Sequence, residues 1–220
     1  MNQWTILWDM DGVLADTAEA HYKTWSKFLA EKNITYTYEE FKQFFGMKNQ
    51  DFLPLVLGYT PSQERLDQIS DAKEKTFRDF VDGNIHIFPG VIEMLERFKK
   101  GGFKQAVVSS APIENIEVVI DYLNLRTYFD ALVSPIGMVS KPEPDIFLHA
   151  ADILKTSPDR CLVIEDSIHG ITAARRAHMK VLAVATSYPP EKLKDADKVV
   201  NRLSDLTEDD VKELLHFSVQ

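Results

Sequence analysis

The chain has 220 residues, of which 45% are hydrophobic, so it can form one large domain or a domain with a smaller insertion. Its formal net charge of -9 argues against non-specific binding to nucleic acid or to an anionic membrane, because both need a basic surface. The single cysteine, Cys161, excludes an internal disulfide, and with no signal-peptide pattern or long apolar stretch we expect a monomeric cytoplasmic protein.

The first predicted element is a short buried strand at residues 5–8, and the carboxylates of Asp9 and Asp11 follow it at once. Residues 17–83 are then predicted to be almost entirely helical, because apolar residues recur on one face of residues 17–30 and three further helical stretches follow. Pro61 is the expected start of the last of these helices, since proline is favoured in a first helical turn.

Strands and helices alternate from residue 84 onward. The pattern predicts strands at 105–110, 161–166 and 180–185, with an apolar run at 130–134, and helices at 91–100, 113–124, 144–154, 167–178 and near 207–217. Such alternation is typical of an α/β fold, a Rossmann-like parallel sheet with helices on both faces. We therefore expect an α/β core formed by residues 1–16 and 84–220, interrupted by a helical insertion at 17–83.

Polar side chains follow each apolar strand of this predicted core. In open parallel sheets, ligands bind beyond the carboxyl ends of the strands, where the strand order reverses. The residues expected at that edge are Asp9, Asp11, Ser109, Ser110, Lys141, Glu165 and Asp166. Carboxylates, hydroxyls and one cation at one edge can bind a divalent metal and a phosphate group.

The carboxylates need a compensating charge. At an effective dielectric constant near 20, two like unit charges about 4 Å apart repel by roughly 4 kcal/mol. Mg²⁺ bound by Asp9, a main-chain carbonyl near Asp11 and Asp166 would reverse that cost, since Mg²⁺ binds few protein oxygens and keeps water and phosphate ligands. A calcium loop of the EF-hand type beginning at Asp9 is excluded, because it needs glycine and glutamate where Leu14 and Ala20 stand.

The same residues can perform phosphoryl transfer. Asp9, ionised at neutral pH, can attack phosphorus, while Mg²⁺ and Lys141 neutralise the approach of two anions. Asp11 can protonate the leaving oxygen and later activate water, which requires a raised pKa. Ser109 and the backbone N–H groups after it can hold phosphate oxygens, and Asp16 is expected to orient the loop through local hydrogen bonds.

Four stretches in this order, DMDGVLADT, VVSS, SKPEPDIF and IEDSIHGI, resemble the four motifs of the haloacid dehalogenase superfamily, and the resemblance covers essentially the whole chain. The helical insertion is similar to the small α-helical cap of that family. The resemblance implies that Asp9 is the nucleophile and Asp11 the general acid and base. It also implies a phosphate site and an Mg²⁺ site. The phosphate site comprises Ser109, Ser110 and Lys141; the Mg²⁺ site comprises Asp9, Asp11, Glu165 and Asp166.

The presence of Asp11 favours phosphoryl transfer over dehalogenation, because dehalogenating members lack an acid at that place. A phosphonate-cleaving relative would need a Schiff-base lysine from the insertion, and lysines are common there. The stretch from Asp16 to Trp25 is similar to the β-phosphoglucomutases, which implies substrate or positioning roles in the insertion. The insertion residues so implied are His21, Lys48 and Lys75.

Three positions depart from the mutase pattern. Asn49 stands where the mutases have a phosphate-gripping arginine, and Pro112 and Ile113 stand where they have lysine and asparagine. We therefore expect an Mg²⁺-dependent phosphatase that hydrolyses a small sugar or polyol phosphate, with a β-phosphoglucomutase-type mutase as the alternative. A non-catalytic binding module of the same fold is disfavoured, because such a protein is expected to have lost Asp9 or Asp11.

Overall fold

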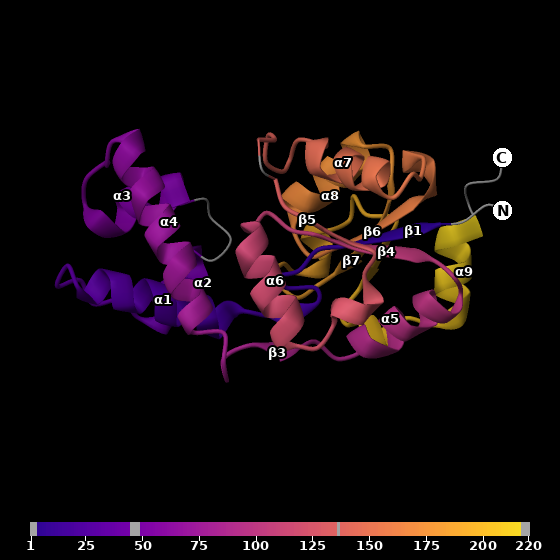
Figure 1. Ribbon diagram of the computed structural model, residues 1–220, viewed down its shortest axis with the longest axis horizontal. Helices are drawn as coiled ribbons and strands as arrows, with labels where there is room; N and C mark the ends of the chain where they lie inside the picture. The colour runs from indigo at the N-terminus through magenta and orange to yellow at the C-terminus, as the bar shows by residue number, and fades with distance from the viewer. Residues whose placement is uncertain (1–3, 45–48, 136, 217–220) are drawn as a thin grey trace. The chain divides into compact units, whose positions relative to one another are not determined.

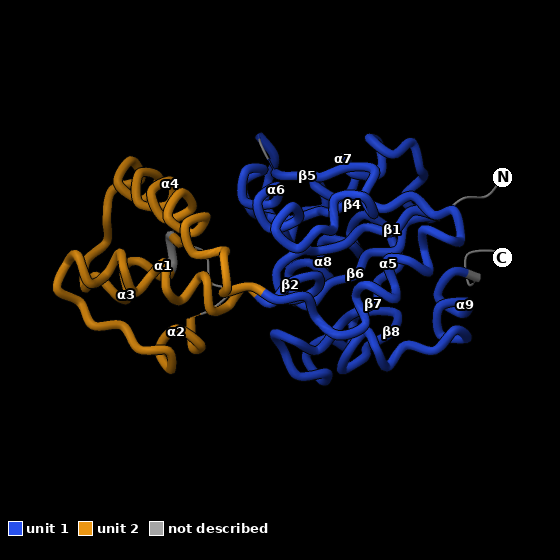
Figure 2. Tube along the Cα trace, turned by 60° about the horizontal axis from the view of Figure 1, so that its bottom comes forward, with its two compact units in different colours: residues 1–16, 86–220 blue, residues 17–85 orange. Residues whose placement is uncertain are grey.

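The computed structural model describes residues 4–44, 49–135 and 137–216 (Figure 1). The chain forms two compact units, coloured separately in Figure 2. The first comprises Met1–Asp16 and His86–Gln220 and is called the α/β unit below; the second, Thr17–Ile85, is called the helical unit.

A parallel sheet of six strands forms the centre of the α/β unit as far as the chain is described. In spatial order the strands are β5 (Ala131–Val133), β4 (Lys104–Val108), β1 (Thr5–Trp8), β6 (Cys161–Glu165), β7 (Lys180–Val184) and β8 (Lys198–Val200). The predicted α/β fold with a parallel sheet is therefore confirmed. Strand β8 was not predicted, because it has three residues and only the short 3₁₀ turn Pro190–Lys192 stands where a helix would separate it from β7.

Helices pack on both faces of this sheet. Helices α7 (Asp145–Ile153) and α8 (Ile168–Arg176) lie on one face, and α5 (Val91–Lys100) and α9 (Glu208–His216) lie on the other (Figure 1). The remaining helix of the unit among the described residues is α6 (Ile113–Tyr122). The two-sided cover explains the uninterrupted apolar runs of the central strands, since strands buried on both faces show no polar alternation.

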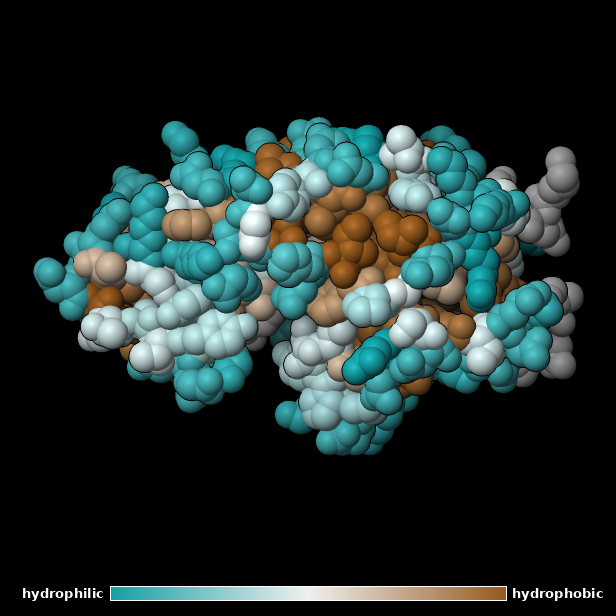
Figure 3. All heavy atoms as spheres, turned by 90° about the horizontal axis from the view of Figure 1, so that it is seen from below, coloured by the Kyte–Doolittle hydropathy of each residue, from teal (hydrophilic) through white to brown (hydrophobic). Residues whose placement is uncertain are grey.

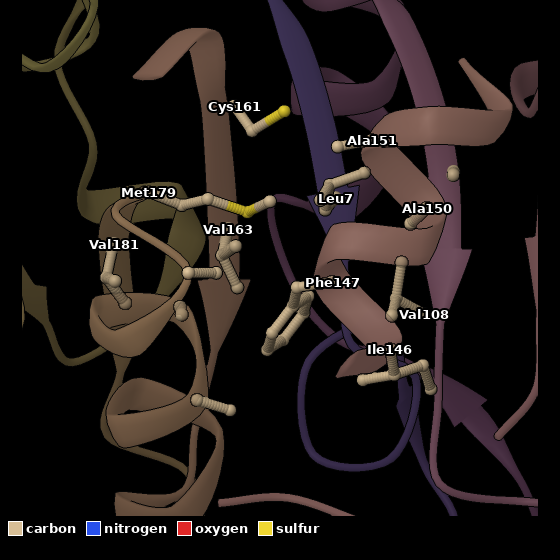
Figure 4. Packing of buried hydrophobic residues seen from close by; sticks show 14 of the residues in the cluster. Leu7, Val108, Ile146, Phe147, Ala150, Ala151, Cys161, Val163, Met179 and Val181 are labelled. Atoms are coloured by element: carbon tan, nitrogen blue, oxygen red, sulfur yellow. The ribbon is translucent and has the colours of Figure 1, made fainter. Parts of the chain in front are cut away.

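Successive residues of β1 supply the cores on the two faces. Leu7 belongs to the cluster that includes Val163 and Phe147, beneath α7 and α8 (Figure 4). Trp8 points the other way and meets the ring of Phe98 from α5 edge to face, with ring centroids 6.0 Å apart. Both β1 side chains are fully buried. Strand β1 is therefore fixed from both sides, which determines where the residues after Trp8 lie.

The strand order places a reversal beside β1. From β1 the sheet extends through β4 to β5 on one side and through β6 and β7 to β8 on the other. Because every pairing is parallel, the chain leaves β1, β4, β6 and β7 at one common edge. This edge is where α/β sheets bind ligands.

The helical unit has its own apolar core. Its helices are α1 (Ala18–Ala30), α2 (Tyr38–Phe44), α3 (Asn49–Leu57) and α4 (Gln63–Asp79). Trp25 and Leu29 of α1, Phe52 of α3 and Ile69 of α4 are buried together. Helix α4 begins two residues later than the expected start at Pro61, because the Ser62 hydroxyl accepts the Arg65 N–H as an N-terminal cap.

A two-stranded antiparallel ribbon, also unpredicted, lies where the chain leaves and re-enters the α/β unit. It pairs β2 (Ala15–Asp16) with β3 (His86–Ile87), so Asp16 lies opposite His86. Two-residue strands carry no periodicity that a sequence pattern could reveal.

The face of the molecule in Figure 3 carries mostly hydrophilic side chains, with an apolar area near its middle. None of the helices in the described part of the chain combines the length and the hydropathy needed to cross a membrane.

A buried glutamine links three elements of the α/β unit. Gln105 in β4 is 1% exposed, and its Oε1 accepts a hydrogen bond of 3.0 Å from the Trp8 indole N–H. Its Nε2 donates to the carbonyl oxygens of Leu95 and Tyr128, at 3.1 and 3.3 Å. The amide therefore satisfies three polar groups that β1, α5 and the segment before β5 would otherwise bury unpaired.

We predict that Gln105→Met lowers the free energy of unfolding by about 3 kcal/mol, because it keeps the side-chain volume but leaves these buried groups without partners. Urea unfolding followed by circular dichroism measures the change. The exposed Gln63→Met in α4 is the control, with an expected change below about 0.5 kcal/mol. A loss below about 1 kcal/mol for Gln105→Met would show that these hydrogen bonds contribute little.

Candidate active site

The first acid after β1 lies deep in the edge described above. Asp9 is 8% exposed, and its N–H donates to the Ile164 carbonyl at 2.9 Å, which continues the pairing of β1 with β6. Its Oδ1 accepts a hydrogen bond of 2.6 Å from the Lys141 ammonium. Burial raises the pKa of Asp9 well above its ordinary value, and Glu165 and Asp166 add to this, although Lys141 opposes them.

Lys141 contacts several groups of the site at once. Its Nζ donates to Asp9 Oδ1, to Glu165 Oε1 at 2.8 Å and to the carbonyl of Val108 at 3.4 Å, and it lies 4.8 Å from the ring centroid of Phe147. Burial lowers the pKa of Lys141, but the carboxylates of Asp9 and Glu165 outweigh this effect and hold the pKa above its usual value. Lys141 therefore stays charged in a buried position.

The carboxylate of Glu165 is bound on both oxygens. Besides Lys141 at Oε1, its Oε2 accepts the N–H groups of Asp166 and Ser167 and the Ser167 hydroxyl, at 2.9, 2.8 and 2.9 Å. A Cβ on Gly170 in α8 would come 1.7 Å from Glu165 Oε1, so only glycine leaves space for the carboxylate there. Glu165 is thus held at the N-terminal end of α8, where negative charge is favoured.

Asp166 follows β6 and is 4% exposed. Its Oδ2 accepts a hydrogen bond from the Ser187 hydroxyl. Burial raises the pKa of Asp166 to about 7, and the charges of Glu165 and Asp11 add to this, while Ser187 and Lys141 lower it. A carboxyl with this pKa stays ionised at neutral pH only in part, unless a cation approaches it.

Asp11 lies in the tight turn after β1. The turn is closed by hydrogen bonds from Gly12 N–H to the Ala15 carbonyl and from Ala15 N–H to the Met10 carbonyl, at 2.9 and 3.0 Å. Gly12 has φ of +83°, and a Cβ there would lie 1.9 Å from Asp166 Oδ2. Glycine therefore allows the turn that carries Asp11 to approach Asp166 closely.

The two serines after β4 complete the edge. Ser109 is buried, and its N–H donates to the Val133 carbonyl at 3.2 Å, which fixes it beside β5. Its hydroxyl accepts the Ala111 N–H at 3.1 Å and so shapes the turn before α6. Ser110 is exposed. The predicted residues of the α/β unit thus all lie at one edge, Glu165 as the last residue of β6 and the others in loops, and Lys141 is in direct contact with Asp9 and Glu165.

The residues predicted in the insertion have different surroundings. His21 in α1 stacks on the ring of Phe77, with centroids 4.3 Å apart, and its Nδ1 lies 3.1 Å from the Nζ of Lys73. Lys75 is exposed on α4, and Lys48 lies outside the described residues.

Lys73, which the sequence reasoning passed over, is only 6% exposed, and its Nζ lies 5.8 Å from the ring centroid of Trp25. The spacing of Leu66, Ile69, Lys73 and Phe77 places this lysine on the buried face of α4 and was a signal available in the sequence.

A divalent cation suits the charge of this edge. Asp9, Glu165 and Asp166 are buried carboxylates, and Lys141 is a buried cation that contacts Asp9 and Glu165. No group of three His, Cys, Asp or Glu side chains in the described part of the chain is arranged to hold a metal. Mg²⁺ needs only one or two carboxylates beside carbonyl, water and phosphate oxygens. Asp9 and Asp166 therefore fit that requirement, whereas Glu165 is already bound on both oxygens.

A family model described as haloacid dehalogenase-like hydrolase matches residues 6–184. The chain is 29% identical to fructose-1-phosphate phosphatase of Escherichia coli, over 81% of this chain and 95% of that protein. It is 34% identical to the chloroplastic protein SUPPRESSOR OF QUENCHING 1 of Arabidopsis thaliana, over 87% of this chain but only 19% of that much longer protein. The crystal structure of β-phosphoglucomutase from Clostridium difficile matches with a TM-score of 0.82 and 26% identity, over 99% of both chains.

The raised pKa of Asp166 predicts how stability depends on pH without metal. Between the unfolded value near 3.9 and the folded value of about 7, the folded protein holds a proton that the unfolded chain has lost, so raising the pH destabilises the fold. Asp166→Asn removes this effect. In EDTA, we expect the variant to lose less stability than the wild type between pH 5 and pH 8, by a few kcal/mol at about 1.4 kcal/mol per pKa unit.

Urea unfolding at both pH values in EDTA measures this difference. The exposed Asp152→Asn in α7 is the matched control, and it should keep the pH dependence of the wild type. If Asp166→Asn also kept that dependence, the buried carboxyl of Asp166 would not be its source.

Proposed function

The chain belongs to the haloacid dehalogenase-like hydrolase family and is a phosphatase or phosphotransferase, and on this premise we propose that it hydrolyses a small sugar or polyol phosphate through a phosphoaspartate on Asp9. The observation that carries the proposal is the buried contact of Asp9 with Lys141, which is itself held by Glu165. A carboxylate held beside a charged lysine at the ligand-binding edge of the sheet is suited to attack a phosphate ester.

In the first step, an oxygen of Asp9 attacks phosphorus while the bond from phosphorus to the ester oxygen breaks. Because Lys141 binds Oδ1, we assign the attack to Oδ2. Asp11 gives its proton to the leaving oxygen, which departs as an alcohol. Lys141, the Ser109 hydroxyl and the Ser110 N–H bind the non-bridging oxygens and neutralise the charge of the transferring group.

In the second step, Asp11 accepts a proton from the water that attacks phosphorus, the acyl phosphate bond breaks, and inorganic phosphate leaves a regenerated Asp9 carboxylate. Mg²⁺, held by Asp9, Asp166 and the main chain near Asp11, would supply the positive charge that lets one anion attack another. The excess of buried carboxylates over buried cations at this edge supports that cofactor.

A mutase is the second candidate, because the similarity to β-phosphoglucomutase spans 99% of both chains. The mutase reaction must hold a phosphosugar at both ends. Pro112 and Ile113 offer no side-chain donor at the start of α6, and the Asn49 amide donates to the Ser70 hydroxyl at 3.0 Å within the helical unit. These residues favour water over a second sugar hydroxyl as the acceptor.

We further propose that the physiological partner is a small phosphorylated metabolite and that the protein works as a cytoplasmic monomer. Similarity to fructose-1-phosphate phosphatase supports the substrate class. Phosphate release from a panel of sugar, polyol, nucleotide and glycolate phosphates in Mg²⁺ would rank substrates. Light scattering would test the monomer.

We predict that Asp9→Asn lowers kcat by at least about 10³-fold, because the amide cannot form the phosphoenzyme. Phosphate release from p-nitrophenyl phosphate with Mg²⁺ measures this, with circular dichroism to verify the fold and the exposed Asp152→Asn as control. Appreciable turnover by a folded Asp9→Asn protein would refute the nucleophile.

A parallel reaction with β-glucose 1-phosphate and a trace of the 1,6-bisphosphate separates the two candidates. Glucose 6-phosphate forming faster than inorganic phosphate would overturn the phosphatase in favour of the mutase. The absence of both products and of p-nitrophenyl phosphate hydrolysis would refute phosphoryl transfer.

A matched pair of variants can decide which lysine of the insertion contributes to the proposed reaction. Of the two lysines two residues apart on α4, Lys73 is buried against His21, whereas Lys75, which the resemblance suggested, is exposed. We predict that Lys73→Met lowers kcat/KM about tenfold or more while Lys75→Met changes it less than twofold. Thermal unfolding of both variants separates an effect on the reaction from a loss of the fold. A larger effect from Lys75→Met would return the role to that residue.

A further inference from the structure

Two hydroxyl residues after β7 reach back to the loops after β1 and β6. The Ser187 hydroxyl is hydrogen-bonded to Asp166 Oδ2. The Thr186 hydroxyl donates to the Gly12 carbonyl at 2.5 Å and lies 3.4 Å from the same Asp166 oxygen. Neither residue belongs to the four stretches that resemble family motifs.

The backbone of this segment is anchored in the sheet. Ala185 N–H donates to the Val200 carbonyl at 2.9 Å, and Thr186 N–H donates to the Val184 carbonyl at 3.0 Å. The two hydroxyls therefore extend from a fixed point at the end of β7. Since β1, β6 and β7 are neighbours in the sheet, the segment joins three adjacent strand ends.

The contact among these loops is close. A Cβ on Gly12 would come within 1.9 Å of Asp166 Oδ2 and 3.1 Å of Ser187 Oγ, so the turn, the carboxylate and the hydroxyl meet at one place. Asp166 is 4% exposed, and so its protein partners rather than bulk water set its orientation. The donors on Oδ2 restrict the rotation of the carboxylate and therefore the directions in which Oδ1 can point.

We propose that Ser187 and Thr186 are positioning residues for the divalent cation: Ser187 orients the Asp166 carboxylate, and Thr186 holds the turn that carries Asp11 through the Gly12 carbonyl. The inference rests on the proposed function and deepens it. Partners that orient metal ligands commonly change metal affinity by 10–100-fold when they are removed. If these hydrogen bonds only joined the loops, removing them would leave the affinity for Mg²⁺ unchanged.

The test is Mg²⁺ binding to the whole protein by titration calorimetry without substrate. Ser187→Ala should raise the Kd for Mg²⁺ about tenfold, and Thr186→Val with Ser187→Ala should raise it further. Ser187→Thr should restore the affinity, because it keeps the hydroxyl at an exposed position. Ser157→Ala, at an exposed serine before the opposite end of β6, is the matched control and should bind as the wild type does.

A kinetic measurement complements the titration. Phosphate release by Ser187→Ala should be reduced at limiting Mg²⁺ and should recover to within about twofold of the wild-type rate at saturating Mg²⁺. Thermal unfolding in EDTA establishes that each variant is folded.

A Kd for Ser187→Ala within twofold of the wild type would overturn the proposal, as would equal losses for Ser187→Ala and Ser187→Thr. Failure of the wild type to bind Mg²⁺ would overturn it together with the proposed cofactor. If the wild type bound Mg²⁺ but hydrolysed no phosphate ester, the proposed function would fail, while the affinities would still decide the role of Ser187.

Discussion

The buried contact between Lys141 and Asp9 is the interaction on which the rest of the site depends. A lone carboxylate at this depth would bind a proton and lose its reactivity, because burial disfavours the charged form. Lys141 opposes that tendency at a distance of 2.6 Å, and Glu165 keeps the lysine charged from its other side. The sheet makes this possible, since β1 and β6 are packed on both faces and hold Asp9 beside Ile164. Burial thus disfavours the charge of Asp9 and also fixes the position of Lys141, which compensates it.

Glu165 shows how one carboxylate can organise a site without reacting. Its Oε2 receives two N–H groups and a hydroxyl at the start of α8, and its Oε1 receives Lys141. The helix end and the lysine are thereby fixed relative to each other, with Gly170 leaving space for the carboxylate. A direct bond from Glu165 to Mg²⁺ would have to be added to a carboxylate that already accepts four donors. Support of Lys141 and of the loop carrying Asp166 is therefore the role that the arrangement favours for Glu165.

Patterns in the sequence predicted most of the α/β unit, because its central strands are apolar runs and its helices are long enough to show a period. The positions of the candidate site residues at the ends of β1, β4 and β6 were predictable for the same reason, since the end of a recognisable strand fixes where the next side chain lies. Strand β8 and the β2–β3 ribbon are too short to carry a period. Lys73 was overlooked, although its spacing from Phe77 placed it on the buried face. Thr186 and Ser187 could not be found, because only the tertiary approach of three loops gives their hydroxyls partners.

The choice between water and a sugar hydroxyl as acceptor does not lie in the residues that react. In the proposed mechanism Asp9 forms the same phosphoenzyme in either case, and Asp11 can remove a proton from water or from an alcohol. The difference must come from groups that would hold the far end of a phosphosugar against Asp11 long enough to exclude water. Pro112 precedes α6 and offers it no side-chain cap, and Ile113, its first residue, adds an apolar side chain where a donor would be needed. With no side-chain donor at Pro112 or Ile113, a sugar bound in the proposed mechanism has less to hold it after the first transfer, and water, at far higher concentration, is the acceptor that the proposal favours.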